Sequence, residues 1–249
     1  MNTLFKLLIM LSFTSVFLWG LENGRIEELT QEIEKYGKLS DLHLERAQLY
    51  IQNREFKKAY DDLNKAMILN PELEDSQILL GEVLLEEEQL NASKKLLERL
   101  LGVSKDKTIR MRAHFLLGDI YRAMDNQKEA LLYYEKVLHT NLSHEQVHYL
   151  RLADSYYELG DFRRSINVLK TGMNTMIEKD LLRQKIVDIS MEEGNYSLAL
   201  SVLDEMIEED KNNTQLYYKR ASIFKEQGKL KEMDREIKMA KLTLLKKNS

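Results

Sequence analysis

The chain has 249 residues, of which 31% are charged and 43% hydrophobic, and this balance favours a folded globular protein over a disordered one. The formal net charge of −4 excludes an overall basic field that would hold nucleic acid, and the absence of cysteine excludes disulfides, thiolate catalysis and cysteine-ligated zinc. With 10 glycines and 1 proline, the chain has few of the residues that strand-and-turn folds need, so an all-α fold is predicted.

An apolar leader is predicted at residues 1–20. A short segment with one positive charge precedes an uncharged run over residues 7–19, which has the length of a signal-peptide core and is short for a membrane-spanning helix. Gly20 suits the position before a cleavage site, but Leu18 is too large for the usual small-x-small pattern. We expect either export with cleavage, to the periplasm or outside the cell, or anchoring to the membrane by residues 4–21.

Residues 21–39 are predicted to form a linker and a leading helix. Apolar residues recur in this stretch at the spacing of one helix face: Ile26, Leu29, Ile33 and Tyr36. An amphipathic helix of this kind is expected to pack its apolar face on the domain that follows.

A period of 34 residues runs through the remainder of the chain. Gly-Asp-Phe at 160, Gly-Asn-Tyr at 194 and Gly-Lys-Leu at 228 are each 34 residues apart. Extending this period outward predicts six units: 40–73, 74–107, 111–144, 146–179, 180–213 and 214–247. The spacing slips by three residues at 108–110 and by one residue at Glu145.

Four positions of the unit show a common pattern. The eighth and twentieth residues are mostly small, and the twenty-fourth is large and apolar. The eleventh residue is large or aromatic in five units: Tyr50, Leu84, Tyr121, Tyr156 and Phe224. Ser190 stands at this position in the fifth unit. The pattern predicts a helical hairpin whose two helices cross at small residues, and hairpins that stack to bury their apolar faces.

This pattern resembles the tetratricopeptide repeat. The segments LADSYYELGDFRRSINVL (152–169) and LLGDIYRAMDNQKEALLYYEKVL (116–138) are similar to the family pattern, and the segment at 47–71 also has its late proline, Pro71. The resemblance covers about residues 40–247. It implies an all-α solenoid of about six stacked hairpins in a right-handed superhelix, with the last unit acting partly as a cap.

The sequence His-Glu-Gln-Val-His at 144–148 matches the short signature of a zinc metalloprotease. A zinc site of that type needs a third ligand on a separate helix and an open metal position, and residues 149–154 do not supply the histidine of the extended motif. In the repeat register, this stretch instead lies at a helix start, with Ser143 as N-cap and Gln146 completing a capping box. His43 and His114 fall at the fourth repeat position and are interpreted as packing residues.

The resemblance implies that the first helix of each hairpin lines a concave surface. The ninth position of four units then carries an acidic stripe, with further polar and aromatic side chains beside it. The predicted partner-binding residues are Glu82, Asp119, Arg122, Asp154, Tyr157, Asp188 and Tyr218. Such a stripe favours a basic or polar peptide, with the aromatic residues supplying contact area. The alternative is a solvated row of charges without a ligand.

These features predict a non-catalytic scaffold or adaptor that binds a peptide or helix of another protein. No catalytic residues, metal or cofactor are predicted, and a membrane is expected to be contacted only through the N-terminal segment. A self-associating structural or assembly protein of the cell envelope is the alternative. A zinc hydrolase using residues 144–148 is a remote one.

Overall fold

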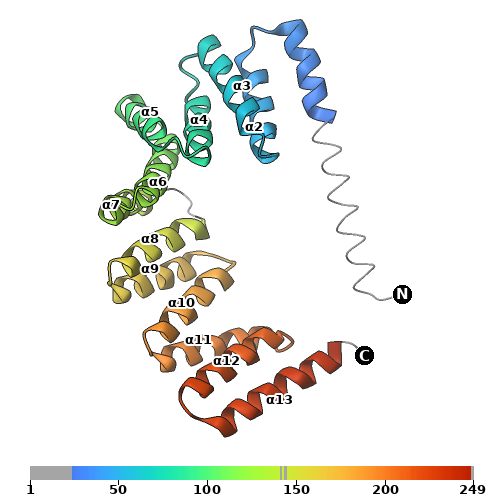
Figure 1. Ribbon diagram of the computed structural model, residues 1–249, viewed down its shortest axis with the longest axis vertical. Coiled ribbons are helices and arrows are strands. Elements are labelled where there is room, and N and C mark those ends of the chain that lie inside the picture. Colours follow the sequence, from blue (N-terminus) through green and yellow to red (C-terminus); the bar gives the residue numbers. More distant parts are fainter. Residues whose placement is uncertain (1–23, 141, 143–144, 248–249) are drawn as a thin grey trace. The chain divides into compact units, whose positions relative to one another are not determined.

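A computed structural model describes residues 24–140, 142 and 145–247, and these residues form helices and no strands. The chain divides into two compact units, Met1–Leu142 and Ser143–Ser249. Each unit contains three helical hairpins, drawn in blue to green for unit 1 and in yellow to red for unit 2 (Figure 1).

Unit 1 begins, in its described part, with a helix over residues 24–36, and six helices follow it. They are α2 (Ser40–Gln52), α3 (Phe56–Leu69), α4 (Glu74–Glu86), α5 (Leu90–Val103), α6 (Lys107–Ala123) and α7 (Gln127–Leu138). Each odd-numbered helix packs against the first helix of its own hairpin and, for α3 and α5, against the first helix of the next hairpin. The first helices α2, α4 and α6 also contact one another in succession.

Unit 2 repeats this arrangement over the remainder of the chain. Its helices are α8 (Gln146–Glu158), α9 (Phe162–Thr175), α10 (Asp180–Glu192), α11 (Tyr196–Glu209), α12 (Thr214–Glu226) and α13 (Leu230–Lys247). Helix α9 packs against α8 and α10, and α11 packs against α10 and α12. The apolar face of one hairpin is therefore covered by the next, as expected for stacked repeats.

The first helices begin at Ser40, Glu74, Gln146, Asp180 and Thr214, which are the first residues of five predicted units. Helix α6 differs, because it begins at Lys107 and has 17 residues where the other first helices have 13. Its N-cap, Asp106, accepts a hydrogen bond from the backbone N–H of Ile109 at 2.9 Å. The slip at 108–110 therefore adds about one helical turn to α6 instead of lengthening a loop.

The turn inside each hairpin has the same left-handed backbone conformation. Gly160, Gly194 and Gly228 have φ values of 78°, 69° and 69°. The same turn position in unit 1 is occupied by non-glycine residues with positive φ: Arg54 (59°), Glu88 (58°) and Asp125 (57°). The glycine of the Gly-Asp-Phe pattern thus marks a position that needs a positive φ. In unit 1 non-glycine residues adopt this φ at some conformational cost.

The small residues of the eighth repeat position lie where the two helices of a hairpin cross. A Cβ atom at Gly118 would lie 2.5 Å from the ring of Tyr134, and one at Gly81 would lie 2.8 Å from the side chain of Leu97. Both large partners occupy the twenty-fourth position and are almost fully buried. The two columns of the sequence pattern are therefore packing partners.

A buried polar network joins the leading helix to the first hairpin. Asp62 of α3 accepts two hydrogen bonds from Arg46 of α2, both at 2.7 Å, and lies 2.9 Å from Nδ1 of His43. Arg46 also donates to Oγ1 of Thr30, on the helix over 24–36, at 2.9 Å. His43 and Asp62 are each 4% exposed. The histidine at the fourth position of the first repeat is therefore both packed in the interior and hydrogen-bonded to Asp62.

The leading helix packs as predicted only in part. Leu29 is fully buried, whereas Tyr36 is 51% exposed. None of the helices in the described part of the chain is long and apolar enough to cross a membrane. The predicted leader at 1–20 lies outside the described residues.

Candidate partner-binding surface

In unit 2, the carboxylates of the ninth repeat position form ion pairs with the next hairpin. Asp154 of α8 lies 2.6 Å from Nζ of Lys185 on α10, and Asp188 of α10 lies 2.5 Å from Nζ of Lys219 on α12. Both lysines occupy the sixth position of their repeats. The spacing of the hairpins therefore places a carboxylate on one first helix beside a lysine on the next. Each ion pair joins two successive first helices.

In unit 1, the predicted acidic residues are also paired. Glu82 of α4 lies 3.1 Å from Arg112 of α6, which also lies 3.2 Å from Asp75. Asp119 accepts a hydrogen bond from Oη of Tyr134 at 2.6 Å and lies 3.8 Å from Arg122. The Asp119 side chain is only 16% exposed, so it serves the packing of its own hairpin.

The predicted aromatic residues of unit 2 lie in two environments. Tyr157 donates a hydrogen bond from Oη to the Glu192 carboxylate, and this bond, together with partial burial, raises the pKa of Tyr157 to about 12. Its ring also packs against Phe162 with the ring centroids 5.2 Å apart. Tyr218 is 38% exposed and presents its ring to solvent.

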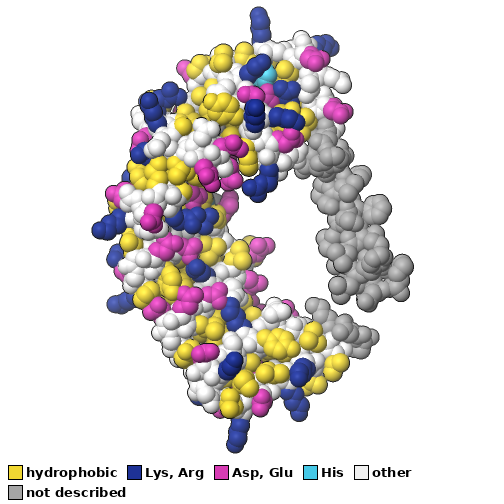
Figure 2. Space-filling model, in the orientation of Figure 1, with side chains coloured by type: hydrophobic (Ala, Val, Ile, Leu, Met, Phe, Trp, Pro, Cys, Tyr) yellow, Lys and Arg dark blue, Asp and Glu magenta, His cyan; other side chains and the backbone are white. Residues whose placement is uncertain are grey.

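The surface that results is mixed in charge within each unit. Figure 2 shows acidic and basic side chains interspersed on the visible face, with apolar side chains between them. Sequence reasoning identified the row of carboxylates but missed the basic residues that face it. The lysines at the sixth position of the last two repeats, Lys185 and Lys219, could have indicated these ion pairs from the sequence.

The residues at 144–148 begin helix α8. The N-cap is Glu145, not the predicted Ser143, which lies outside the described residues. The Glu145 carboxylate caps the backbone at His148, and Nδ1 of His148 accepts a hydrogen bond from the Glu145 N–H at 3.0 Å. The capping box thus uses Glu145 and His148, because the helix starts two residues later than the Ser143 assignment requires.

No metal centre is found in the part of the chain that the structure describes, where no three His, Cys, Asp or Glu side chains gather closely enough to hold an ion. His144 lies outside that part. His114 is partly buried beside Tyr133, and this burial, with Lys136 and Arg110 nearby, lowers the pKa of His114 to about 4. Its imidazole is therefore neutral at pH 7 and suits a packing role.

Comparison with known proteins supports the hairpin assignment. A family model described as tetratricopeptide repeat matches residues 112–142, which contain most of α6 and all of α7. This match supports a tetratricopeptide repeat in the third hairpin. No curated protein matches the sequence.

Three solved structures illustrate the shared fold. The C-terminal part of a tetratricopeptide-repeat protein from Cytophaga hutchinsonii has a TM-score of 0.66 at 14% identity, over 90% of this chain and 93% of that one. PilF of Pseudomonas aeruginosa has a TM-score of 0.62 at 17% identity, over 80% of this chain and 91% of that one. A chain of the APC/C hetero-tetramer Cut9–Hcn1 has a TM-score of 0.63 at 10% identity, over 89% of this chain.

This chain spans 43% of the length of the chain it matches in the Cut9–Hcn1 structure. At identities of 10–17%, the three matches show a shared fold. The predicted fold class, an all-α helical-repeat solenoid, is confirmed. The predicted right-handed superhelix over the whole chain stays a prediction.

Proposed function

We propose that this protein is a non-catalytic scaffold that binds a segment of another protein along the first helices of its hairpins. The support is the register of unit 2, in which the same acid–base step joins α8 to α10 and α10 to α12, through Asp154 with Lys185 and Asp188 with Lys219. A regular surface of this kind offers equivalent contacts to an extended peptide or a helix. The tetratricopeptide-like fold supports the same function.

The proposed partner segment is polar and carries basic side chains. In each ion pair the lysine contacts one carboxylate oxygen, Oδ1. Oδ2 of Asp188 also accepts a hydrogen bond from Gln184 at 3.3 Å, and each oxygen of an ionised carboxylate can accept a further hydrogen bond. A basic side chain of the partner would bind there without displacing the lysine. The exposed ring of Tyr218 adds flat contact area at the end of this row.

A charge-exchange experiment tests this proposal. The variant Asp154→Lys, Lys185→Asp, Asp188→Lys, Lys219→Asp inverts both ion pairs, so the pairs can reform while the order of charges along the surface is reversed. We expect this variant to remain folded. It should recover at least about tenfold less of a partner that the wild-type chain recovers in a pull-down from its native cells, because like charges placed opposite each other weaken binding by at least this factor.

The matched control is the single variant Lys65→Glu, on an exposed position of α3. It is expected to recover the partner as well as wild type does. Equal recovery by the charge-exchange variant, with helical content unchanged, would place the partner on another surface and reject the site residues proposed here.

We also propose that the leader at 1–20 directs the protein to export or anchors it to a membrane. The run without charges over residues 7–19 supports this localisation. The measurement is the intact mass of the chain purified from the membrane and soluble fractions of its native cells. A shortened chain in the soluble exported fraction indicates cleavage, and a full-length chain in the membrane fraction indicates an anchor. A full-length chain in the cytosol rejects both.

A further inference from the structure

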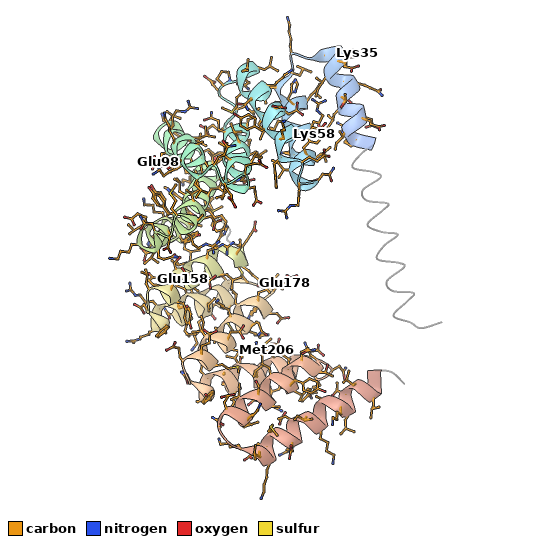
Figure 3. The ribbon with its side chains drawn as sticks, in the orientation of Figure 1. Lys35, Lys58, Glu98, Glu158, Glu178 and Met206 are labelled. Carbon is orange, nitrogen blue, oxygen red and sulfur yellow. The ribbon has the colours of Figure 1, made fainter. Side chains whose placement is uncertain are left out.

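A pocket of about 760 Å³ lies at the turn end of the α8–α9 hairpin, beside the neighbouring hairpin of unit 2. Its walls come from the first half of α9, the last turn of α10 and the start of α11. Glu158, labelled in Figure 3, lies next to the turn at this end of the hairpin, whereas Glu178 lies at the opposite end. No residue of the Asp154–Lys185 and Asp188–Lys219 ion pairs lines the pocket. Tyr157 packs on Phe162 at its rim.

The pocket exists because the eleventh residue of the fifth repeat is small. In the third repeat a large side chain from this position occupies the crevice between two second helices. Tyr121 stacks on Tyr133 of α7 with the ring centroids 5.3 Å apart, and Nζ of Lys94 on α5 lies 5.5 Å from the centroid of its ring. Ser190 at this position fills little of the crevice.

The corresponding crevice in unit 1 provides a comparison. It has a volume of about 160 Å³, and Leu84 occupies the eleventh position there. The two crevices are lined by residues at the same repeat positions, with Phe56 and Lys57 corresponding to Phe162 and Arg163. The crevice with serine at the eleventh position is therefore larger than the one with leucine there.

The inner wall of the pocket carries an unsatisfied hydroxyl. Ser190 is 2% exposed, and its Oγ has no hydrogen-bond partner. A buried hydroxyl without a partner is destabilising, and native proteins rarely leave one unless water or a ligand reaches it. Ile189 and Leu198 lie beside it, so the inner part combines one polar group with apolar walls.

The outer part of the pocket is aromatic and basic. Phe162 is 36% exposed, and Arg163 and Lys170 are exposed residues that form no ion pair within the described part of the chain. Arg164 is held by Asp161, which also caps α9. The unpaired groups at the mouth are thus two cations and one carboxylate, Glu193.

The geometry points to a binding site for a tyrosine side chain of a partner peptide that has acidic residues next to the tyrosine. The ring would fill the crevice that aromatic residues of the chain fill elsewhere, and its phenol hydroxyl would pair with Oγ of Ser190. Acidic neighbours would pair with Arg163 and Lys170 at the mouth. Buried aromatic anchors with a polar tip are frequent centres of peptide recognition. This inference does not depend on the surface proposed above.

The test measures binding of a synthetic acidic peptide, acetylated and amidated, with one central tyrosine among glutamates and aspartates, to the full-length chain. Ser190→Tyr fills the crevice from within and is expected to weaken binding at least about tenfold. Ser190→Ala keeps the space and removes the hydroxyl, so it should weaken the tyrosine peptide about fivefold and leave the equivalent phenylalanine peptide unchanged. Arg163→Glu with Lys170→Glu should weaken both peptides, whereas Lys57→Glu, at the equivalent position in unit 1, should weaken neither.

Circular dichroism establishes that each variant is folded, and the exposed pair Arg163→Glu with Lys170→Glu provides the test if Ser190→Tyr does not fold. The inference is overturned if wild type shows no saturable binding of the tyrosine peptide up to about 1 mM. It is also overturned if Ser190→Tyr binds like wild type, or if an alanine peptide binds as well as the tyrosine peptide. Loss of this site would leave the result of the charge-exchange experiment unaffected.

Discussion

Replacing Asp62 by alanine is expected to lower the free energy of unfolding by about 3–5 kcal/mol, because a buried charge would lose its partner. Asp62 is 4% exposed and accepts both hydrogen bonds from Arg46, whose side chain is 15% exposed. Without this carboxylate, the guanidinium and the ring of His43 would remain in a largely dry interior. Urea unfolding followed by circular dichroism measures the effect.

Asp61 provides the matched control, since it precedes Asp62 on the same helix and is exposed. Asp61→Ala is expected to change the free energy of unfolding by less than about 0.5 kcal/mol. Similar losses for the two variants would contradict a stabilising role for the buried network. A loss confined to Asp62→Ala would show that the first hairpin depends on a polar contact between its two helices.

Replacing Gly118 by alanine is expected to destabilise the protein by a net amount of up to about 2 kcal/mol. The added Cβ would lie 2.5 Å from the ring of Tyr134, which is 1% exposed and has little room to move. Overpacking of this kind costs about 1–3 kcal/mol, which exceeds the gain of up to about 1 kcal/mol from the better helix propensity of alanine. Thermal and urea unfolding measure the difference.

The matched control is Gly102→Ala on α5, because no atom lies within 4 Å of the Cβ that it adds. This variant is expected to be more stable than wild type by up to about 1 kcal/mol. The double variant Gly118→Ala, Tyr134→Leu recreates the alanine–leucine combination of Ala47 with Leu63. It should be less destabilised than the sum of the single variants by at least about 1 kcal/mol, and simple additivity would argue against direct packing of the two positions.

The arrangement of helices could be predicted from the sequence because the signals are local and repeated. Five first helices begin at the first residue of a predicted unit, such as Ser40 and Gln146. The extension of α6 to Lys107 could not be predicted, because three extra residues can lengthen either a loop or a helix. In the structure these residues lengthen the helix, and Asp106 caps its start.

The candidate site could be predicted only in part. The row of carboxylates was visible at the ninth repeat position, but its pairing was not, because Asp188 and Lys219 are 31 residues apart and meet only when two hairpins stack. The cap of α8 was assigned to Ser143, whereas Glu145 forms it. Which side chain caps a helix depends on the direction in which the side chains at its start point, and the repeat spacing does not give that direction.

The sequence by itself determined the period, the hairpins and the repeat positions that hold small or large residues. These features follow from helical periodicity inside a single repeat unit of about 34 residues. It also showed that Ser190 departs from its column. Only the tertiary structure decided what that departure produces, because α9, α10 and α11 together enclose the pocket. The same holds for the ion pairs of Asp154 and Asp188, whose charges are set by the sequence and whose partners are set by the stacking of neighbouring hairpins.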